Sequence, residues 1–272
     1  FFFYLFKIIG LKASSLLGGI IFSIYGKFSK RNKIVHKNLN IAFPKLNERR
    51  KKEIIRKMWV HFGKVIGEYP NLNKLRIGEN ILIQNENNLI EPLKKNSNCL
   101  FFSAHIGNWE LTSHLLIKRG FKINFIYRAP NNKLVDELLS KIRTGYGVGL
   151  IKKGNEGARQ CLKILNMKGG HIGMLIDQKM NDGVKTIFFN KCVMSPSAIV
   201  KFAVKFNCPI IPAVCTRFKS TSFKISYLKP ITPHKLKQIG NEAQIMNHLN
   251  KIVEGWIKKN PEQWIWFHNR WK

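Results

Sequence analysis

The segment Cys99-Leu-Phe-Phe-Ser-Ala104, followed directly by His105-Ile-Gly-Asn-Trp-Glu110, decides the fold more than any other part of the chain. The first six residues are apolar or small and predict a short buried strand. Residues 111–117 follow a helical pattern, so the chain changes from strand to helix at the motif. Gly107 allows the backbone to approach a neighbouring segment closely at this turn.

A histidine at the carboxyl end of a core strand, with a carboxylate five residues later, is suited to general base catalysis. We predict that His105 removes a proton from a hydroxyl group so that the oxygen can attack a carbonyl carbon. Glu110 would fix the tautomer of the imidazole and stabilise the imidazolium that forms. The alternative is structural, with a histidine that caps the helix and a glutamate on its solvated face.

The rest of the chain alternates between short apolar runs and helical patterns, which predicts an α/β fold. The expected architecture is a mostly parallel central sheet flanked by helices, with active residues at the strand ends. An amphipathic helix is expected at residues 47–69, with Asn47 as its cap. The expected strands are residues 81–84, 99–104, 123–127, 148–151, 171–176, 186–189, 210–216 and 223–228.

The first 26 residues are apolar and begin with Phe1-Phe-Phe-Tyr-Leu-Phe6. They predict a membrane-associated helix, either spanning the bilayer or lying at its interface, and residues 27–272 are expected to form a single α/β domain. A signal peptide is disfavoured, because no basic leader precedes the apolar run. The chain does not start with Met, so we expect an earlier natural start. A core helix with an unusually aromatic surface is the alternative.

Charge narrows the choice of partners without deciding it. The chain has 272 residues, with 47 Lys and Arg against 15 Asp and Glu, for a net charge of +32. This excess implies a polyanionic partner such as an anionic membrane surface, a phosphorylated lipid, an acidic protein or a nucleic acid. The basic cluster at residues 27–33 would place the rest of the chain on the cytoplasmic side of a membrane.

Several other classes of site lack their signatures. The sequence has no phosphate-binding loop, and residues 145–149 precede a strand and predict a turn. The histidines form no recognisable metal-ligand set, so no metal is expected. Five cysteines without C-x-x-C spacing indicate reduced structural thiols. No serine lies in a G-x-S-x-G motif, and Ser195 is interpreted as the N-cap of a helix at residues 198–206.

Two charged residues stand where predicted strands end. Arg128 follows the strand at residues 123–127, and Asp177 follows the strand at residues 171–176. A charge at the end of a core strand is costly unless it is paired or serves a site. A solvated or salt-bridged surface residue is the simpler interpretation of each.

Together these segments resemble a known enzyme family. The spacing of His105 and Glu110 resembles the H-x4-D/E motif of glycerolipid-type acyltransferases, and the Gly-Asn-Trp-Glu variant resembles the bacterial lipid A late acyltransferases, which are Kdo-dependent lauroyl and myristoyl transferases. The resemblance covers nearly the whole chain, and its specificity comes from the ordered set of segments. The further matching segments are residues 38–44, 127–132, 177–179, 261–266 and 270–272.

The resemblance implies roles for individual residues. Arg128 would hold a phosphate or sugar acid of the acceptor, and Asp177 would orient that arginine or the acceptor hydroxyl. Asn108 is assigned with them to substrate binding. The chain departs from the family pattern at residues 190–194, where a glycine turn and a Thr or Ser are usual.

The expected activity is that of an acyltransferase for groups other than aminoacyl groups. A fatty acyl chain would pass from an acyl carrier protein to a hydroxyl of a phosphorylated, Kdo-bearing lipid A precursor at the cytoplasmic face of the bacterial inner membrane. We expect no cofactor, because a thioester is already activated, and no nucleic-acid partner. Two alternatives remain: a glycerolipid or glycolipid acyltransferase that uses acyl-CoA, and a nonenzymatic protein that binds anionic lipid or nucleic acid.

Overall fold

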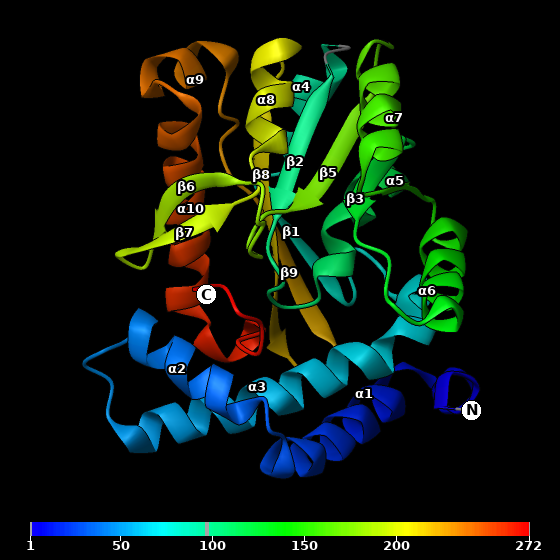
Figure 1. Cartoon of the computed structure of the whole chain (residues 1–272). Coiled ribbons are helices and arrows are strands. Elements are labelled where there is room, and N and C mark those ends of the chain that lie inside the picture. The colour runs from blue at the N-terminus through cyan, green and yellow to red at the C-terminus, as the bar shows by residue number, and fades with distance from the viewer. Residues whose placement is uncertain (1, 96–97, 272) are drawn as a thin grey trace.

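A computed structural model describes residues 2–95 and 98–271 (Figure 1). The strands are β1 (Ile81–Gln84), β2 (Cys99–Ser103), β3 (Ile123–Tyr127), β4 (Val148–Lys152), β5 (His171–Leu175), β6 (Val184–Phe188), β7 (Lys191–Ser195), β8 (Ile210–Lys219) and β9 (Ser222–Tyr227). The α-helices are α1 (Phe2–Phe28), α2 (Asn32–Ala42), α3 (Glu48–Glu68), α4 (Asn87–Lys94), α5 (His114–Lys118), α6 (Lys133–Gly145), α7 (Asn155–Leu165), α8 (Ala198–Lys205), α9 (Pro233–Ile239) and α10 (Glu242–Lys259). Short 3₁₀ helices are η1 (Tyr69–Lys74), η2 (Trp109–Ser113) and η3 (Pro261–Gln263).

The central sheet has the strand order β1-β9-β8-β2-β5-β3-β4. All of its neighbouring strands are parallel except β8 and β9, which are antiparallel. The prediction of a mostly parallel sheet flanked by helices is therefore confirmed. The strand β2, which leads into the segment from His105 to Glu110, lies between β8 and β5. In Figure 1 the carboxyl ends of β2 and β5 point toward α3.

The core lies on both faces of this sheet, as a buried parallel sheet requires. Alternate side chains of β2 enter the two core clusters: Leu100 and Phe102 enter one, and Cys99 and Phe101 enter the other. All five residues of β2 are buried. This explains why the strand has a continuous apolar sequence rather than an alternating one.

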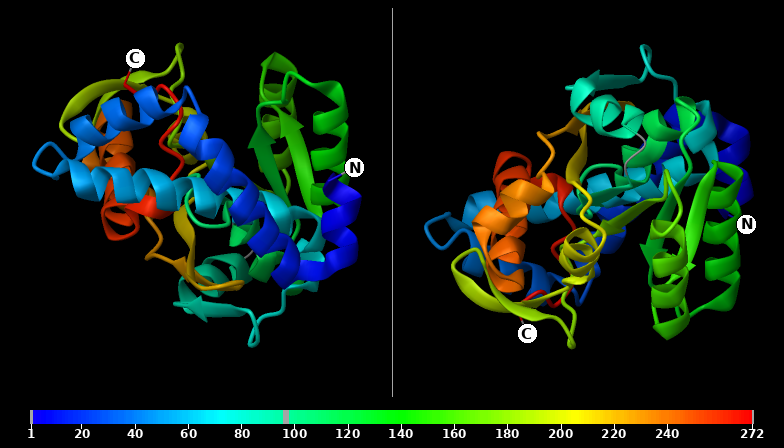
Figure 2. Two further views of the ribbon diagram at one scale, coloured as in Figure 1. Left: turned by 90° about the horizontal axis from the view of Figure 1, so that it is seen from below. Right: turned by 90° about the horizontal axis from the view of Figure 1, so that it is seen from above.

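The helix α1 packs along α3 by close backbone contact. A Cβ added to Gly18 would lie 2.3 Å from the carbonyl oxygen of Gly63, and one added to Gly67 would lie 2.1 Å from that of Ser14. Only residues without a side chain fit at such a crossing. Figure 1 shows α1, α2 and α3 together at the lower end of the molecule, and in the left view of Figure 2, seen from below, they lie in front.

The outer side of α1 is apolar and exposed. Residues Phe3–Phe28 are long and apolar enough to cross a membrane, although 28% of the most apolar window is buried within the protein. The backbone of α1 is kinked at Gly10, where φ is +79°. After the kink, exposed large apolar side chains recur at every fourth residue, at Leu16, Ile20, Ile24 and Phe28. Tyr4 and Ile8 are exposed before the kink. An apolar N-terminal helix that is a candidate for membrane association is thus present.

Two local expectations are corrected and one is confirmed. The strand expected at residues 186–189 leaves the central sheet and forms an antiparallel pair with β7, because a strand pattern does not specify its partner. Ser195 is the last residue of β7 rather than a helix cap, and its hydroxyl accepts a hydrogen bond from Arg270 at 2.7 Å. The side chain of Asn47 caps α3 as predicted, accepting from the backbone of Arg50.

Candidate active site

The site begins where two neighbouring strands end. In the register of β2 and β5, Ser103 lies beside Leu175, and His105 and Asp177 each lie two residues beyond the end of their strand. Nδ1 of His105 lies 2.9 Å from Oδ1 of Asp177. The other carboxylate oxygen of Asp177 accepts the backbone N–H of His105 at 2.9 Å.

The carboxylate of Asp177 is buried and ionised. Trp264 donates its indole N–H to Oδ2 of Asp177 at 2.7 Å. Burial alone would raise the pKa of Asp177, but the charge of His105 and its hydrogen bond hold this pKa well below its ordinary value. An ionised carboxylate only accepts hydrogen bonds, so Nδ1 of His105 carries a proton, and in the neutral form of the ring Nε2 carries the free lone pair. The side chain of His105 is 18% exposed, which leaves the ring open to substrate.

The turn after His105 is held by the backbone. Gly107 has φ +60°, and a Cβ there would lie 1.9 Å from the carbonyl oxygen of Cys215. The N–H of Gly107 bonds to the carbonyl of Gln263 at 3.0 Å, and the N–H of Ile265 bonds to the carbonyl of His105 at 3.2 Å. These contacts explain why the sequence has glycine at this position.

Glu110 lies in a separate ion pair. Arg143 donates to both carboxylate oxygens of Glu110, at 3.0 and 2.6 Å. The hydroxyl of Tyr69 and the indole of Trp109 also donate to this carboxylate, at 2.7 and 3.1 Å. Burial raises the pKa of Glu110, but the charge and hydrogen bonds of Arg143 outweigh burial and leave it lowered.

The structure therefore differs from the expectation that Glu110 holds the imidazole. Asp177 occupies that position, because the register of β2 and β5 brings it beside His105. Glu110 is connected to the ring through Trp109, whose indole lies edge-on to the imidazole with ring centroids 5.2 Å apart. Asp177, expected to orient Arg128 or the acceptor, is directed to His105 instead.

The other two expected substrate residues lie in different surroundings. Arg128 is exposed just beyond the end of β3, as the sequence suggested. Asn108 is completely buried, and its amide nitrogen donates to Glu68 at 2.9 Å. The assignment of Asn108 to substrate binding stays a prediction, and the structure places its side chain in the interior against Glu68.

A mostly apolar pocket opens beside Glu110. Its polar lining includes Glu110 and Arg143, and Trp109 extends it toward His105. Sequence analysis did not identify Arg143 and Tyr69, because each lies far along the chain from the motif. It included Trp264 in a matching segment but gave this residue no role. The apolar side chains that line the pocket are Phe125, Ile126, Val148, Leu150 and Leu175.

Comparison with known families fits this geometry. A family model described as bacterial lipid A biosynthesis acyltransferase matches residues 1–272. The chain belongs to this family. No protein in the curated set matches it. The described residues of the acyltransferase contain no cluster of His, Cys, Asp or Glu that could hold a metal ion.

Proposed function

We propose that this acyltransferase moves a fatty acyl chain from an acyl carrier protein thioester to a hydroxyl of a phosphorylated, Kdo-bearing lipid A precursor. The observation that carries the proposal is the His105–Asp177 pair, set at adjacent strand ends next to an apolar pocket. The family of the chain supplies the reaction class. Donor and acceptor follow from the resemblance of the motif segments.

The chemistry follows from the tautomer of His105. Its Nε2 takes the proton of the acceptor hydroxyl while the alcohol oxygen attacks the thioester carbon. Asp177 stabilises the imidazolium that forms. When the tetrahedral intermediate collapses, the carbon–sulfur bond breaks and the imidazolium returns its proton to the thiolate. Backbone N–H groups at the start of η2 are candidates to stabilise the oxyanion.

Glu110 acts in this proposal on the position of the base rather than on the proton. It accepts from Trp109 and pairs with Arg143, so it fixes the indole that lies against His105. The apolar residues of β3 and β4 beside Glu110 would contact the acyl chain. Arg128, exposed beyond β3, would hold a phosphate or sugar acid of the acceptor, because its planar fork suits bidentate oxyanions.

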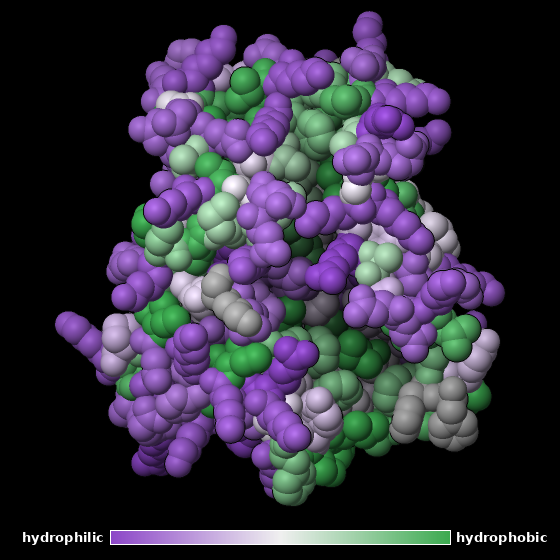
Figure 3. All heavy atoms as spheres, viewed as in Figure 1, coloured by the Kyte–Doolittle hydropathy of each residue, from purple (hydrophilic) through white to green (hydrophobic). Residues whose placement is uncertain are grey.

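The surface supports a site at the cytoplasmic face of the bacterial inner membrane. The exposed apolar side of α1 would lie in the lipid, and the basic residues that follow it would meet anionic headgroups. Figure 3 shows hydrophilic side chains over much of one face, with a group of apolar ones at its lower centre and right. Acyl carrier proteins are acidic, so a basic surface also suits the donor.

One assay tests the proposal. Purified wild-type protein is given a Kdo-bearing lipid A precursor with acyl-carrier-protein or acyl-CoA donors, and the products are measured by mass spectrometry. We expect one added acyl chain, faster transfer from the carrier protein, and loss of transfer in His105→Ala. Transfer only from acyl-CoA to a glycerolipid would support the related alternative. Lipid binding without transfer would support the nonenzymatic one.

A further inference from the structure

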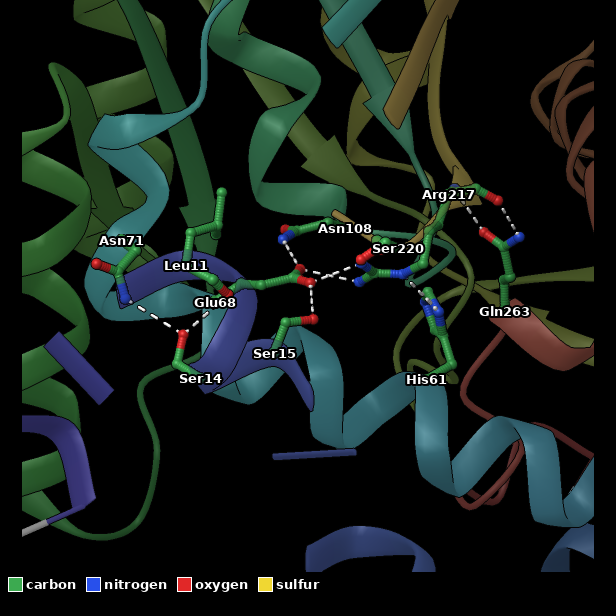
Figure 4. Close-up of polar contacts among 10 residues, drawn as sticks. All are labelled: Leu11, Ser14, Ser15, His61, Glu68, Asn71, Asn108, Arg217, Ser220 and Gln263. Atoms are coloured by element: carbon green, nitrogen blue, oxygen red, sulfur yellow. Dashed lines mark hydrogen bonds and ion pairs between the residues drawn. The ribbon is translucent and has the colours of Figure 1, made fainter. Parts of the chain in front are cut away.

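A buried ion pair lies behind the active-site turn. Glu68, at the end of α3, is completely buried, and Arg217, on β8, has a side chain that is 7% exposed. The two terminal nitrogens of Arg217 donate to the two oxygens of Glu68, at 2.6 and 2.9 Å (Figure 4). The pair touches none of the groups proposed to react, so the mechanism above leaves it without a role.

The same carboxylate joins two other parts of the molecule. Ser15 of α1 donates its hydroxyl to one oxygen of Glu68 at 2.6 Å, and Asn108 donates its amide to the other at 2.9 Å. Figure 4 shows both side chains converging on Glu68 from opposite sides. Four donated hydrogen bonds use the full accepting capacity of a carboxylate. A glutamine at this position would place an N–H₂ group against donors.

The end of α3 thereby fixes both neighbours of Trp109. Glu68 holds Asn108, and the next residue, Tyr69, donates its hydroxyl to Glu110. Trp109 stands between these two anchored residues with its indole against His105. Displacement of this end of α3 would move the whole segment from Asn108 to Glu110.

Arg217 confines the turn from the other side. Its backbone N–H and C=O both bond to the side-chain amide of Gln263, at 2.8 and 2.7 Å. The backbone carbonyl of Gln263 in turn accepts a hydrogen bond from the backbone N–H of Gly107. His61 accepts from Nε of Arg217 at 3.4 Å, and burial together with that charge lowers the pKa of His61 to about 3, so the ring is a neutral acceptor.

We propose that Glu68 and Arg217 are positioning residues for acyl transfer, and that Ser15 makes α1 a part of this support. The inference rests on the proposed function. It adds that α1 contributes to turnover through its contact with Glu68 as well as to membrane attachment. A membrane that pulled α1 from α3 would lower kcat.

Glu68→Gln tests the pair, with Glu254→Gln as its matched control. Glu254 is also a buried carboxylate on a helix, but it accepts the backbone N–H of Phe189 and forms ion pairs with two lysines of α10. Both variants are measured well below their melting temperatures. We expect kcat of Glu68→Gln to fall by about tenfold or more with little change in KM, since small misplacements of catalytic groups are costly. The kcat of Glu254→Gln should stay at the wild-type value.

Ser15→Ala tests the contribution of α1, with Ser23→Ala as its control. Ser23 is on the same helix, but its hydroxyl bonds only within α1, to the carbonyl of Ile20. The two variants keep the same apolar outer side of α1. We expect kcat of Ser15→Ala to fall by about two- to fivefold, as for the loss of one hydrogen bond, and kcat of Ser23→Ala to stay unchanged.

The outcomes separate this inference from the proposed function. If the wild-type protein transfers no acyl chain, the proposed function fails. If transfer occurs and depends on His105, but Glu68→Gln and Glu254→Gln have equal kcat per folded molecule, the pair is only structural and the inference is overturned. Equal kcat in Ser15→Ala and Ser23→Ala removes α1 from the support. If Glu68→Gln does not fold, equal kcat in Ser15→Ala and Ser23→Ala overturns the inference, and a lower kcat in Ser15→Ala alone supports it.

Discussion

At the scale of single residues, the choice between Asp177 and Glu110 as partner of the base has a chemical consequence. Both carboxylates are ionised, but only that of Asp177 is hydrogen-bonded to the ring of His105. The partner of a catalytic histidine selects the tautomer, so its loss places the proton on the wrong nitrogen. A residue that acts through Trp109 changes only the position of the ring.

This distinction predicts unequal effects of two isosteric variants. Asp177→Asn should lower kcat by about a hundredfold or more, because an amide no longer specifies the tautomer or stabilises the imidazolium. Glu110→Gln should lower kcat less, because the contacts of Glu110 are with Tyr69, Arg143 and Trp109. Steady-state kinetics of both folded variants decides the matter. A larger loss in Glu110→Gln would restore Glu110 as the partner of the imidazole.

Arg128 predicts a separation of binding from chemistry. Arg128→Lys keeps the charge but loses the bidentate fork, and Arg128→Ala loses both. We expect the KM for the acceptor to rise by about one to two orders of magnitude in Arg128→Ala, with a smaller change in kcat. Hydrolysis of the acyl donor without acceptor is the control and should be little affected. Normal acceptor kinetics in Arg128→Ala would make it a surface residue.

At the scale of elements, the contact of α1 with α3 depends on glycines that ordinary helix propensity disfavours. Glycine within a helix costs up to about 1 kcal/mol relative to alanine. A Cβ at Gly63 would meet the backbone oxygen of Gly18 at 2.2 Å, whereas one at Gly255 of α10 meets nothing within 4 Å. Close packing therefore requires glycine at position 63, whereas the space around Gly255 leaves room for a side chain.

Alanine at these two positions should have opposite effects on stability. Gly255→Ala should be neutral or stabilise the protein by up to about 1 kcal/mol. Gly63→Ala should destabilise it by about 1 to 3 kcal/mol, because the added methyl group forces the helices apart. Chemical denaturation of both variants in the same detergent provides the comparison. A stabilised Gly63→Ala would mean that α1 does not pack on α3 as described.

At the scale of the whole molecule, the sequence predicts individual helices and strands better than it predicts which of them lie side by side. The strand that leads to His105 was predictable from its apolar run, and the α/β class from the alternation of patterns. The order of the strands was not predictable, since hydrophobic periodicity does not specify pairing. Strand order brings Asp177 to His105, and helix packing brings Glu68 to Asn108. The site therefore becomes complete only in three dimensions.

Buried histidines predict how the stability of the whole protein depends on pH. Burial lowers the pKa of several histidines, to about 3 for His61 and to about 4 for His114, His171 and His268. Neighbouring positive charges contribute at His61 and His114. In the unfolded chain the same groups have a pKa of about 6.5. Between these values the unfolded state binds more protons, so the free energy of unfolding falls as the pH falls.

The contribution of these histidines should be complete above pH 6.5 and should decrease toward pH 4 by up to about 1.4 kcal/mol per pH unit for each group. Below that range, protonation of Asp177 and Glu110, whose pKa values are lowered, should add to the loss. Denaturant midpoints from pH 8 to pH 4 measure the slope. His171→Gln, which removes one buried imidazole, should reduce the slope of the free energy of unfolding against pH by the contribution of one histidine. A free energy of unfolding that stayed constant between pH 6.5 and pH 4 would contradict burial of these rings in the neutral form. Rings buried in that form take up protons on unfolding, so the free energy of unfolding must fall as the pH falls.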